Sequence, residues 1–297
     1  MKKIEEARAS IAQVLLGLHP GDTLPRTLEL AKGAGVGVGT AQAALDSLEA
    51  DGVIALSAHG SRGRRLVTSD TALLWRDSAR GALTAVLPLP ESREFAGLAT
   101  ALSAECAAAG VPLQLLFRQG SRTRIDQVAS KIVDFSLMSL HAAQHAAAPL
   151  SWIPLGEYTY YARDAVVTIT RRDQAPGHRA RVGIDRSSSD HVALTLSAFP
   201  DTTHVDVPYL FIPEALARGE VDAAIWHRTT SSPVMTASGL DLHELSGAAP
   251  DPTLLEAVLA WRGEDTGVGS LLASTISVPR LRAVQREVMD GVRVPQF

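Results

Sequence analysis

The chain has 297 residues, of which 46% are hydrophobic, and a formal net charge of −4. This length predicts two domains, one of them subdivided, and the charge excludes a polycationic nucleic-acid coat protein. The single cysteine, Cys106, excludes an internal disulfide framework and fits a reducing compartment. No apolar leader run and no stretch of about 18 uninterrupted apolar residues are visible, so we expect a cytoplasmic protein without a membrane span.

Three helices are predicted within the first fifty residues. Apolar side chains recur at helical spacing from Ile4 to Leu18, and a short helix is expected from about Arg26 to Lys32. Glycines in the segment 33–37 permit the positive φ of a tight turn. A third helix is expected over Val38–Asp51. Its predicted buried stripe consists of Ala41, Ala44, Leu45 and Leu48.

A predicted hairpin follows, with strands over Val53–Ser57 and Arg64–Thr68. The order of helix, helix, glycine turn, helix and hairpin is that of a winged helix-turn-helix, whose third helix enters the DNA major groove. Over about residues 5–68 the sequence resembles the GntR family. The positions that carry this resemblance are Leu24-Pro25, Leu30-Ala31, Gly35-Val36, Thr40, Ala44-Leu45, Leu48-Glu49, Gly52-Val53-Ile54, His59-Gly60, Gly63 and Leu66-Val67.

The resemblance implies double-stranded operator DNA as a partner. We expect Thr40 and Gln42 to reach bases or phosphates, while the wing holds the DNA backbone or minor groove. The candidate DNA contacts are Arg26, Thr40, Gln42, His59, Arg62, Arg64 and Arg65. Leu28 and Gly37-Val38 stand where the family usually has Arg and Ser-Arg, and residues 1–69 hold eight basic and seven acidic side chains. That weak positive balance leaves a winged helix used for protein contacts as the alternative.

The remainder of the chain predicts a second, larger domain. A polar segment at 69–80 is expected to link the winged helix, residues 1–68, to an effector domain spanning residues 81–297. Strands alternate with helices in that domain, which predicts parallel sheets with right-handed crossovers. A second alternating block forms a lobe over about 165–235. Helices are expected near the end of the chain, over about Thr253–Trp261 and Leu281–Asp290.

Two α/β blocks and a return segment predict two lobes with a cleft between them, similar to the type II periplasmic-binding-protein fold. The smaller ligand domain of other GntR-like regulators fits this longer domain less well. Over most of residues 81–230 the chain resembles the YhfZ-type regulators. The segments that carry the resemblance are Pro88-Leu89-Pro90, Ser92-Arg93, Glu94–Thr100, Arg118, Gly120-Ser121, Val133-Asp134-Phe135, Ser139, Gly183-Ile184-Asp185, Ser187–Asp190 and Val221–Trp226.

The predicted effector site lies in three loops that end strands and begin helices, at 88–93, 120–124 and 185–190. Hydroxyls, arginines and free N–H groups at helix starts favour an anion such as a carboxylate or phosphate. The candidate ligand contacts are Ser92, Arg93, Ser121, Arg122, Ser139, Tyr158, Ser188 and Ser189. The alternative is that the serines are simple N-caps and the arginines are solvated or paired.

Catalytic and metal-binding patterns are weak. His141 and His145 are four residues apart on a predicted helix, but no H-E-x-x-H motif or acidic third ligand accompanies them. Neither a nucleotide-binding glycine loop nor a G-x-S-x-G elbow is present. We therefore expect no cofactor, no metal and no catalysis, and we predict a ligand-responsive, homodimeric transcriptional regulator. A metabolic enzyme or solute-binding module with a protein-binding winged helix is the alternative.

Overall fold

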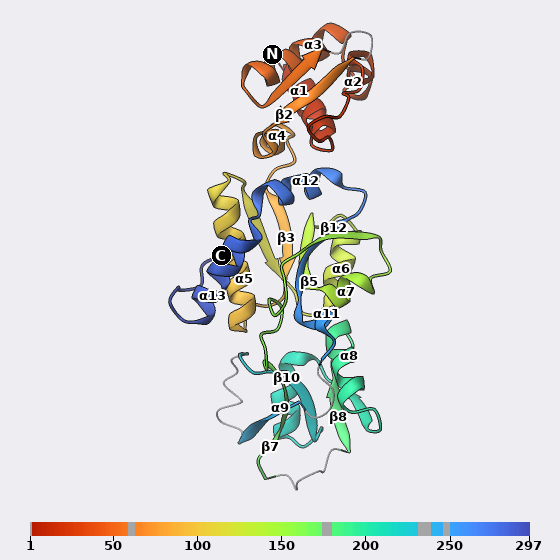
Figure 1. Cartoon of the computed structure of the whole chain (residues 1–297). Coiled ribbons are helices and arrows are strands. Elements are labelled where there is room, and N and C mark those ends of the chain that lie inside the picture. Colours follow the sequence, from red (N-terminus) through yellow and green to blue (C-terminus); the bar gives the residue numbers. More distant parts are fainter. Residues whose placement is uncertain (1, 59–62, 174–179, 231–238, 246–249) are drawn as a thin grey trace. The chain divides into compact units, whose positions relative to one another are not determined.

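The computed structural model (Figure 1) describes residues 2–58, 63–173, 180–230, 239–245 and 250–297. The chain divides into two compact units. The first comprises residues 1–83, 104–114 and 263–277. The second comprises residues 84–103, 115–262 and 278–297. Within the described ranges, no helix combines the length and the apolar character needed to cross a bilayer.

The first unit contains the helix-turn-helix. Its elements are α1 (Lys2–Leu15), α2 (Thr27–Gly33), α3 (Val38–Ala50) and a hairpin of β1 (Ile54–Ala58) and β2 (Arg64–Ser69). Gly35 has a φ of +64° in the turn between α2 and α3, as expected for a residue without a Cβ. The predicted stripe of α3 is buried against the other helices. The sequence pattern therefore places all five elements to within a few residues.

The segment predicted as a linker contains a packed helix, α4 (Thr71–Asp77). Leu74 and Trp75 of this helix are buried, although both lie in an otherwise polar stretch. The Trp75 indole N–H donates to the Gly81 carbonyl at 2.9 Å, and the Arg80 guanidinium lies 4.5 Å from the indole ring centre. On its other side α4 contacts α12 (Thr266–Thr275), a helix that the sequence patterns do not predict. Residues 71–77 are thus part of the first unit's core.

Two five-stranded sheets form the α/β part of the chain. The first has the order β4-β3-β5-β12-β6. Its strands are β3 (Leu83–Leu87), β4 (Leu113–Phe117), β5 (Phe135–Ser139), β6 (Leu150–Pro154) and β12 (Ala257–Arg262). The accompanying helices are α5 (Arg93–Ala108), α6 (Ser121–Ala129), α7 (Leu140–Gln144) and α13 (Val278–Met289). Helix α13 lies beside α5 (Figure 1), where the Gln285 amide donates to the Glu94 carbonyl.

The sheets are mixed rather than purely parallel, which corrects the expectation from strand–helix alternation. In the first sheet β3 and β5 are parallel, but β12 runs antiparallel to both β5 and β6. The predicted helix over 253–261 is also wrong, because only a short α11 (Pro252–Leu255) precedes β12. Strand β12 is central and Ala257–Ala260 are fully buried. Such a strand carries a continuous apolar run without the alternation that distinguishes strand from helix.

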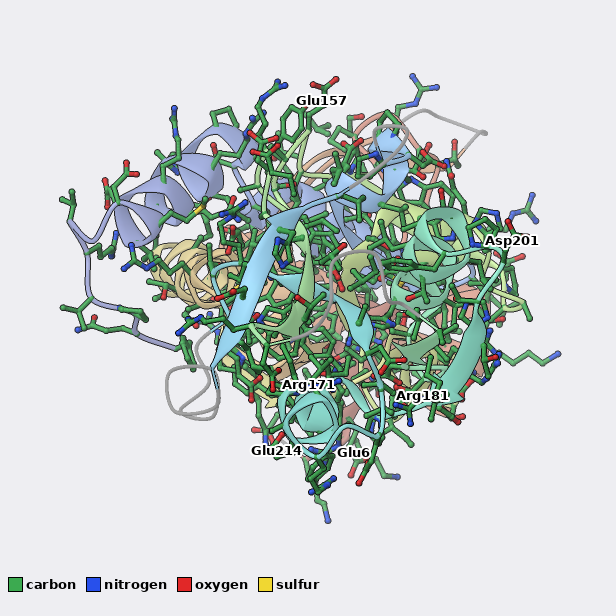
Figure 2. All side chains as sticks on the ribbon, turned by 90° about the horizontal axis from the view of Figure 1, so that it is seen from below. Glu6, Glu157, Arg171, Arg181, Asp201 and Glu214 are labelled. Atoms are coloured by element: carbon green, nitrogen blue, oxygen red, sulfur yellow. The ribbon has the colours of Figure 1, made fainter. Side chains whose placement is uncertain are left out.

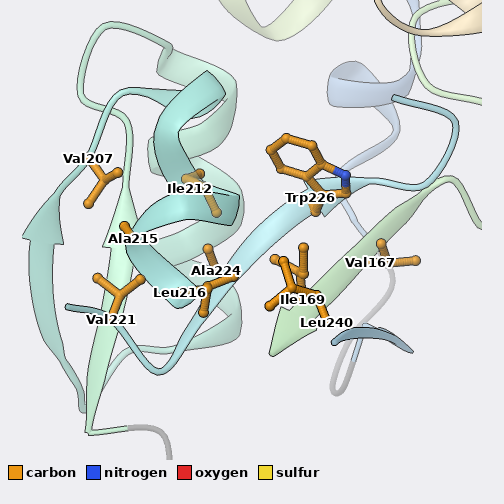
Figure 3. Packing of buried hydrophobic residues seen from close by; sticks show 10 residues of the cluster. All are labelled: Val167, Ile169, Val207, Ile212, Ala215, Leu216, Val221, Ala224, Trp226 and Leu240. Carbon is orange, nitrogen blue, oxygen red and sulfur yellow. The ribbon is translucent and has the colours of Figure 1, made fainter. Parts of the chain in front are cut away.

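The second sheet has the order β11-β7-β10-β8-β9 and defines the second lobe. Its strands are β7 (Val166–Arg171), β8 (Arg181–Ile184), β9 (Thr203–Asp206), β10 (Ala223–His227) and β11 (Leu240–Glu244). Its helices are α8 (Ser189–Ala198), a 3₁₀ turn over Tyr209–Phe211 and α9 (Ile212–Ala217). Figure 3 shows Ile212, Ala215 and Leu216 of α9 packed with β-strand side chains such as Ala224 and Ile169.

A buried carboxylate paired with two arginines ties the strands of the second lobe together. Arg171 and Arg181, labelled in Figure 2, have Nη2 atoms 3.7 and 3.0 Å from Oδ1 of Asp222, which is 1% exposed. The Arg171 guanidinium also donates to the carbonyls of Leu216 and Val221. Paired and hydrogen-bonded in this way, the buried carboxylate is compensated, and the connection from α9 to β10 is fixed.

Candidate functional site

The candidate DNA-contacting helix is α3, which begins at Val38 after an extended Gly37. Thr40 and Gln42 are half-buried, whereas Val38 and Ala43 are exposed. Helical spacing places Val38, Gln42 and Asp46 along one side of α3. The exposed side chains of this helix therefore include the apolar Val38 and Ala43, whereas we expected the polar Thr40 and Gln42 to reach the DNA.

The Gln42 amide is held by neighbouring side chains. Its Oε1 accepts from Arg64 Nη2 at 3.0 Å, and its Nε2 donates to Asp46 Oδ1 at 2.6 Å. The same Arg64 Nη2 donates to Thr27 Oγ1 at 2.9 Å. Arg64 of β2 thus connects the wing strand to the starts of α2 and α3. This arrangement gives Arg64 and Gln42 a role in positioning α3, in addition to the DNA contacts predicted for them.

The other predicted DNA contacts lie at the surface where the structure describes them. The Arg26 side chain is exposed at the start of α2, and its backbone N–H donates to the Glu29 carboxylate at 2.8 Å. Arg65 is exposed on β2. His59 and Arg62 lie outside the described residues, so their predicted roles stay predictions.

In the second unit, two of the predicted ligand loops meet across the lobes. Ser121 Oγ of the first lobe lies 2.9 Å from Ser189 Oγ and accepts the Ser189 backbone N–H at 3.0 Å. The Arg122 backbone N–H donates to the Ser187 carbonyl at 3.2 Å. Gly120 has a φ of +82°, and a Cβ there would lie 2.8 Å from the Ser187 carbonyl oxygen. The close approach of the lobes therefore requires glycine at this position.

A hydroxyl–carboxylate pair forms a second connection between the lobes. Ser139 caps α7 by accepting the Ala142 N–H at 2.9 Å, and its hydroxyl donates to Asp190 Oδ1. Both residues are buried, and Asp190 Oδ2 has no hydrogen-bond partner among the described residues. Burial raises the pKa of Asp190, although the Ser139 hydrogen bond and the Arg124 charge oppose this effect. The carboxylate is therefore only partly compensated.

A third connection joins Glu94 of α5 to the end of β10 and the residues after it. The Thr229 hydroxyl donates to Glu94 Oε2. His227 Nε2 lies 3.4 Å from the same oxygen, which is close enough for an ion pair, but the two atoms do not form a hydrogen bond. Glu94 is completely buried. Burial would raise its pKa, but His227 and Thr229 outweigh burial and lower the pKa below the ordinary value.

A small inter-lobe cavity of about 40 Å³ lies next to Gly120 and Ser121. Among the predicted ligand contacts, Ser92, Ser121 and Ser188 line it. The further lining residues are Pro88, Leu89, Glu91, Phe95, Gln119, Gly120, Arg124, Tyr160, Tyr161, His191, Tyr209 and Thr230. A space of this size holds a water molecule and excludes a metabolite, so the described state of the lobes is closed.

Arg124 is the cation that sequence reasoning missed at this cavity. It is 2% exposed and donates from Nη1 to the Arg118 carbonyl at 3.0 Å and from Nη2 to the Tyr160 hydroxyl at 3.1 Å. Its Nε has no partner among the described residues. Helical phase is the signal that could have found it: Arg124 lies one turn from buried Ser121 and Val128 on α6, whereas Arg122 does not.

The remaining predicted ligand contacts lie elsewhere. Ser139 and Ser189 join the lobes but do not line the cavity. The Arg93 and Arg122 side chains are exposed, and Arg93 Nη1 donates to the Met289 carbonyl at 3.1 Å. Tyr158 lines a separate cavity of about 370 Å³, where the Arg163 guanidinium lies 4.4 Å from its ring centre.

Aromatic side chains form one wall of the inter-lobe cavity, among them Tyr160, Tyr161 and Tyr209. Phe95 lies 5.0 Å from Tyr160 between ring centres, and Tyr209 stacks on Trp226 at 4.4 Å. Burial raises the pKa of Tyr160, so its hydroxyl stays protonated and accepts from Arg124. His191 Nδ1 accepts the Asp185 N–H and Nε2 faces the Ile225 carbonyl, which fixes a neutral tautomer.

The two histidines considered as metal ligands stack on each other. The rings of His141 and His145 are 4.2 Å apart between centres, and His145 Nδ1 lies 2.8 Å from the His141 carbonyl. Across the ranges that the structure describes, no three His, Cys, Asp or Glu side chains are grouped to hold a metal ion. The pair thus has an interaction within its own helix turn.

The fold defines a class of protein with a helix-turn-helix domain followed by a two-lobed domain of the periplasmic-binding-protein kind. The chain belongs to the YhfZ family, because the family model of the YhfZ C-terminal domain matches residues 70–297. A helix-turn-helix domain model matches residues 19–66. These findings confirm the resemblance to YhfZ, whereas the narrower GntR resemblance stays a prediction.

Relatives and solved structures agree with this assignment. The YhfZ protein of Escherichia coli (strain K12) is 29% identical over 305 residues, which cover 100% of this chain and 98% of that protein. The crystal structure of YhfZ from Shigella flexneri has a TM-score of 0.61 at 26% identity, over 77% of this chain and 98% of that one. The periplasmic VFT2 domain of Bordetella pertussis BvgS, at 16% identity and a TM-score of 0.53, covers 74% of this chain and 98% of that domain and shows the fold alone.

Proposed function

We propose that this chain is a DNA-binding transcriptional regulator whose operator affinity is controlled by a small anionic metabolite bound between the two lobes. The helix-turn-helix domain and the likeness of the larger domain to binding-protein folds support the general assignment. The observation that carries the effector site is Arg124, a buried cation at the inter-lobe cavity whose Nε has no partner among the described residues.

The chemistry of Arg124 favours an anion. An N–H buried without a partner costs about 1–3 kcal/mol, and a carboxylate or phosphate oxygen accepting from it would recover this cost. The hydroxyls of Ser92, Ser121 and Ser188 supply further hydrogen bonds at the same cavity. Arg124 thereby replaces the exposed Arg93 and Arg122 as the expected anion contact.

Effector control follows from the state of the lobes. The 40 Å³ cavity is too small for a metabolite, so the lobes separate to admit one and the cross-lobe contacts exchange for ligand contacts. A ligand that binds one arrangement better than the other shifts the population between them. By linkage, operator DNA and effector then change each other's affinity by the same factor. We expect a homodimer on a pseudo-palindromic operator, because operator symmetry mirrors protein symmetry.

A two-stage experiment tests this function. Purified full-length protein is screened by thermal shift against small carboxylates, sugar phosphates and amino acids, since a tight ligand stabilises the folded form by mass action. Each hit is then titrated against Arg124→Gln and against Arg122→Gln, the matched exposed control on the same helix. We expect affinity to fall at least tenfold in the first variant only. Equal affinity in the wild type and Arg124→Gln would contradict the effector site.

DNA binding is tested separately, with the duplex upstream of the chain's own gene. We expect sequence-specific complexes in a gel shift that survive about 150 mM salt, and a change in their affinity when the effector is added. Binding that disappears at this salt, or that competitor DNA of random sequence abolishes, would favour a winged helix that makes protein contacts.

A further inference from the structure

The outward face of α3 has an unusual composition for a helix that contacts DNA. Helix α3 contains no lysine or arginine, and its first turn carries Val38, which is 47% exposed, followed by exposed Gly39. Exposed Ala43 follows one turn later. Gly39 has open space where a Cβ would stand, so another molecule can approach the helix backbone closely there.

The long polar side chain on this face is already occupied. Gln42 reads adenine specifically with both ends of its amide, one donating and one accepting. In the structure its oxygen accepts from Arg64 and its nitrogen donates to Asp46. These two hydrogen bonds hold the amide toward Arg64 and Asp46, although one N–H and one lone pair of the amide remain. The exposed positions at the start of α3, Val38 and Gly39, are both apolar, whereas Thr40 is half-buried.

Methyl groups have one specific partner in the major groove. Thymine presents its C5-methyl there, and apolar side chains discriminate it from the other bases by contact. The residues at the start of a recognition helix are the ones that reach base edges. We infer that Val38 recognises a thymine C5-methyl group, so that each operator half-site has A·T pairs beneath the first turn of α3.

This inference rests on the proposed DNA binding and deepens it. It also fits Val38 at this position, because a thymine methyl needs an apolar partner where a guanine would need arginine. Affinity then comes from phosphate contacts at the edges of the helix, where Arg26, Lys32 and Arg65 are exposed.

The test begins with selection of duplexes from a random pool by the full-length chain at about 150 mM salt. Thymines in the enriched site are then replaced one at a time by uracil, which removes only the methyl group. We expect one or two positions per half-site at which uracil lowers wild-type affinity about fourfold, the effect of one buried methyl. At those positions uracil should have no further effect on Val38→Ala.

Val14→Ala is the matched control, because Val14 on α1 is a valine of similar exposure, 42%. This variant should keep the wild-type response to uracil. Enriched duplexes that show no uracil effect, or an equal uracil effect in the wild type and Val38→Ala, would overturn the inference and leave DNA binding intact. Failure to enrich any duplex would instead contradict the proposed DNA binding itself.

Discussion

Ser139 and Asp190, which are 51 residues apart in sequence, form a buried hydrogen bond that joins the two lobes. The contacts of Ser121 with Ser189 and of Glu94 with Thr229 join the lobes in the same manner, through short polar side chains. Such contacts are each worth about 1–3 kcal/mol net, so water or a ligand can replace them one by one. The closed lobes are therefore held by interactions that a polar effector can exchange.

The stability of the folded protein should depend on pH through Asp190. Because burial raises the pKa of Asp190 above its ordinary 3.8, the folded protein holds the proton more tightly than the unfolded chain. This contribution to stability is complete below pH 3.8 and is lost as the pH rises through the folded-state pKa. Asp190→Asn keeps the oxygen that accepts from Ser139 but does not titrate. We expect the unfolding free energy of the wild type, minus that of the variant, to decrease above pH 3.8.

Urea titrations of both proteins at a series of pH values measure this difference. The subtraction cancels the contributions of the other carboxyl groups to the pH dependence. Arg124 and His141, the basic residues that act on Asp190, are the same in both proteins. A difference that increases with pH would show that Asp190 is stabilised as a carboxylate, contrary to its burial.

Much of the fold follows from local patterns, as the helix-turn-helix shows. Buried Ala41, Ala44, Leu45 and Leu48 repeat at helical spacing, and the glycine turn lies directly before them. Strand β12 could not be predicted in the same way, because a central strand has no polar face and its apolar run matches a buried helix equally well. The polar surroundings of Trp75 predict a position at a domain surface, whereas packing within the first unit buries it.

The candidate site was predictable in outline. Serines at strand ends are expected near a ligand, and Ser92, Ser121 and Ser188 do line the cavity. Whether Arg122 or Arg124 reaches the cavity depends on which side of α6 faces the core. The partners of Ser139 and Glu94 lie 51 and 135 residues further along the chain. Contacts over such separations depend on the packing of the lobes, which no local pattern encodes.

Glu94 should show the opposite pH dependence from Asp190. Its pKa lies below the ordinary 4.5, since the interactions with His227 and Thr229 outweigh burial. A lowered pKa contributes stability that is present above pH 4.5 and is lost as the pH falls through the folded-state value. The unfolding free energy of the wild type, minus that of Glu94→Gln, should therefore decrease as the pH falls below 4.5.

Glu91→Gln provides an internal control for that measurement. Glu91 is more exposed, and partial burial raises its pKa, so its wild-type-minus-variant difference should decrease as the pH rises above 4.5. If both glutamates gave slopes of the same sign, the pairing of Glu94 with His227 and Thr229 would not be the cause.

Arg8 should be important for the stability of the first unit. Its guanidinium, 17% exposed, donates to Asp51 of the α3 end at 2.5 Å and to Asp77 of α4 at 2.6 Å. Arg8→Ala leaves the largely buried Asp77 without this partner, and we expect a loss of about 2 kcal/mol in unfolding free energy. Arg218→Ala, which breaks an exposed pair with Glu220, should leave stability unchanged in the same chemical denaturation. Equal losses in both variants would indicate a nonspecific effect of charge removal.

Gly120→Ala should loosen the contact between the lobes. The new Cβ would lie 2.6 Å from Ser187 Oγ and 2.8 Å from the Ser187 carbonyl oxygen, so the backbone around Ser187 must move away. The amides of Arg122 and Ser189, which donate to Ser187 O and Ser121 Oγ, should then exchange hydrogen for deuterium faster. We expect a loss of about 1–3 kcal/mol in stability from strain and displaced contacts.

Gly219→Ala separates these two causes. Gly219 has a similar φ of +70°, but the nearest atom to its added Cβ is Arg171 Nη1 at 3.8 Å, an ordinary contact distance. This variant should lose only the roughly 1 kcal/mol that a left-handed alanine costs, with unchanged exchange at Arg122 and Ser189. Because the two variants share the backbone strain and differ in the clash, faster exchange confined to Gly120→Ala would trace the loosening to the approach of Ser187. Equal exchange in both would mean that the two lobes do not meet at Gly120 in solution.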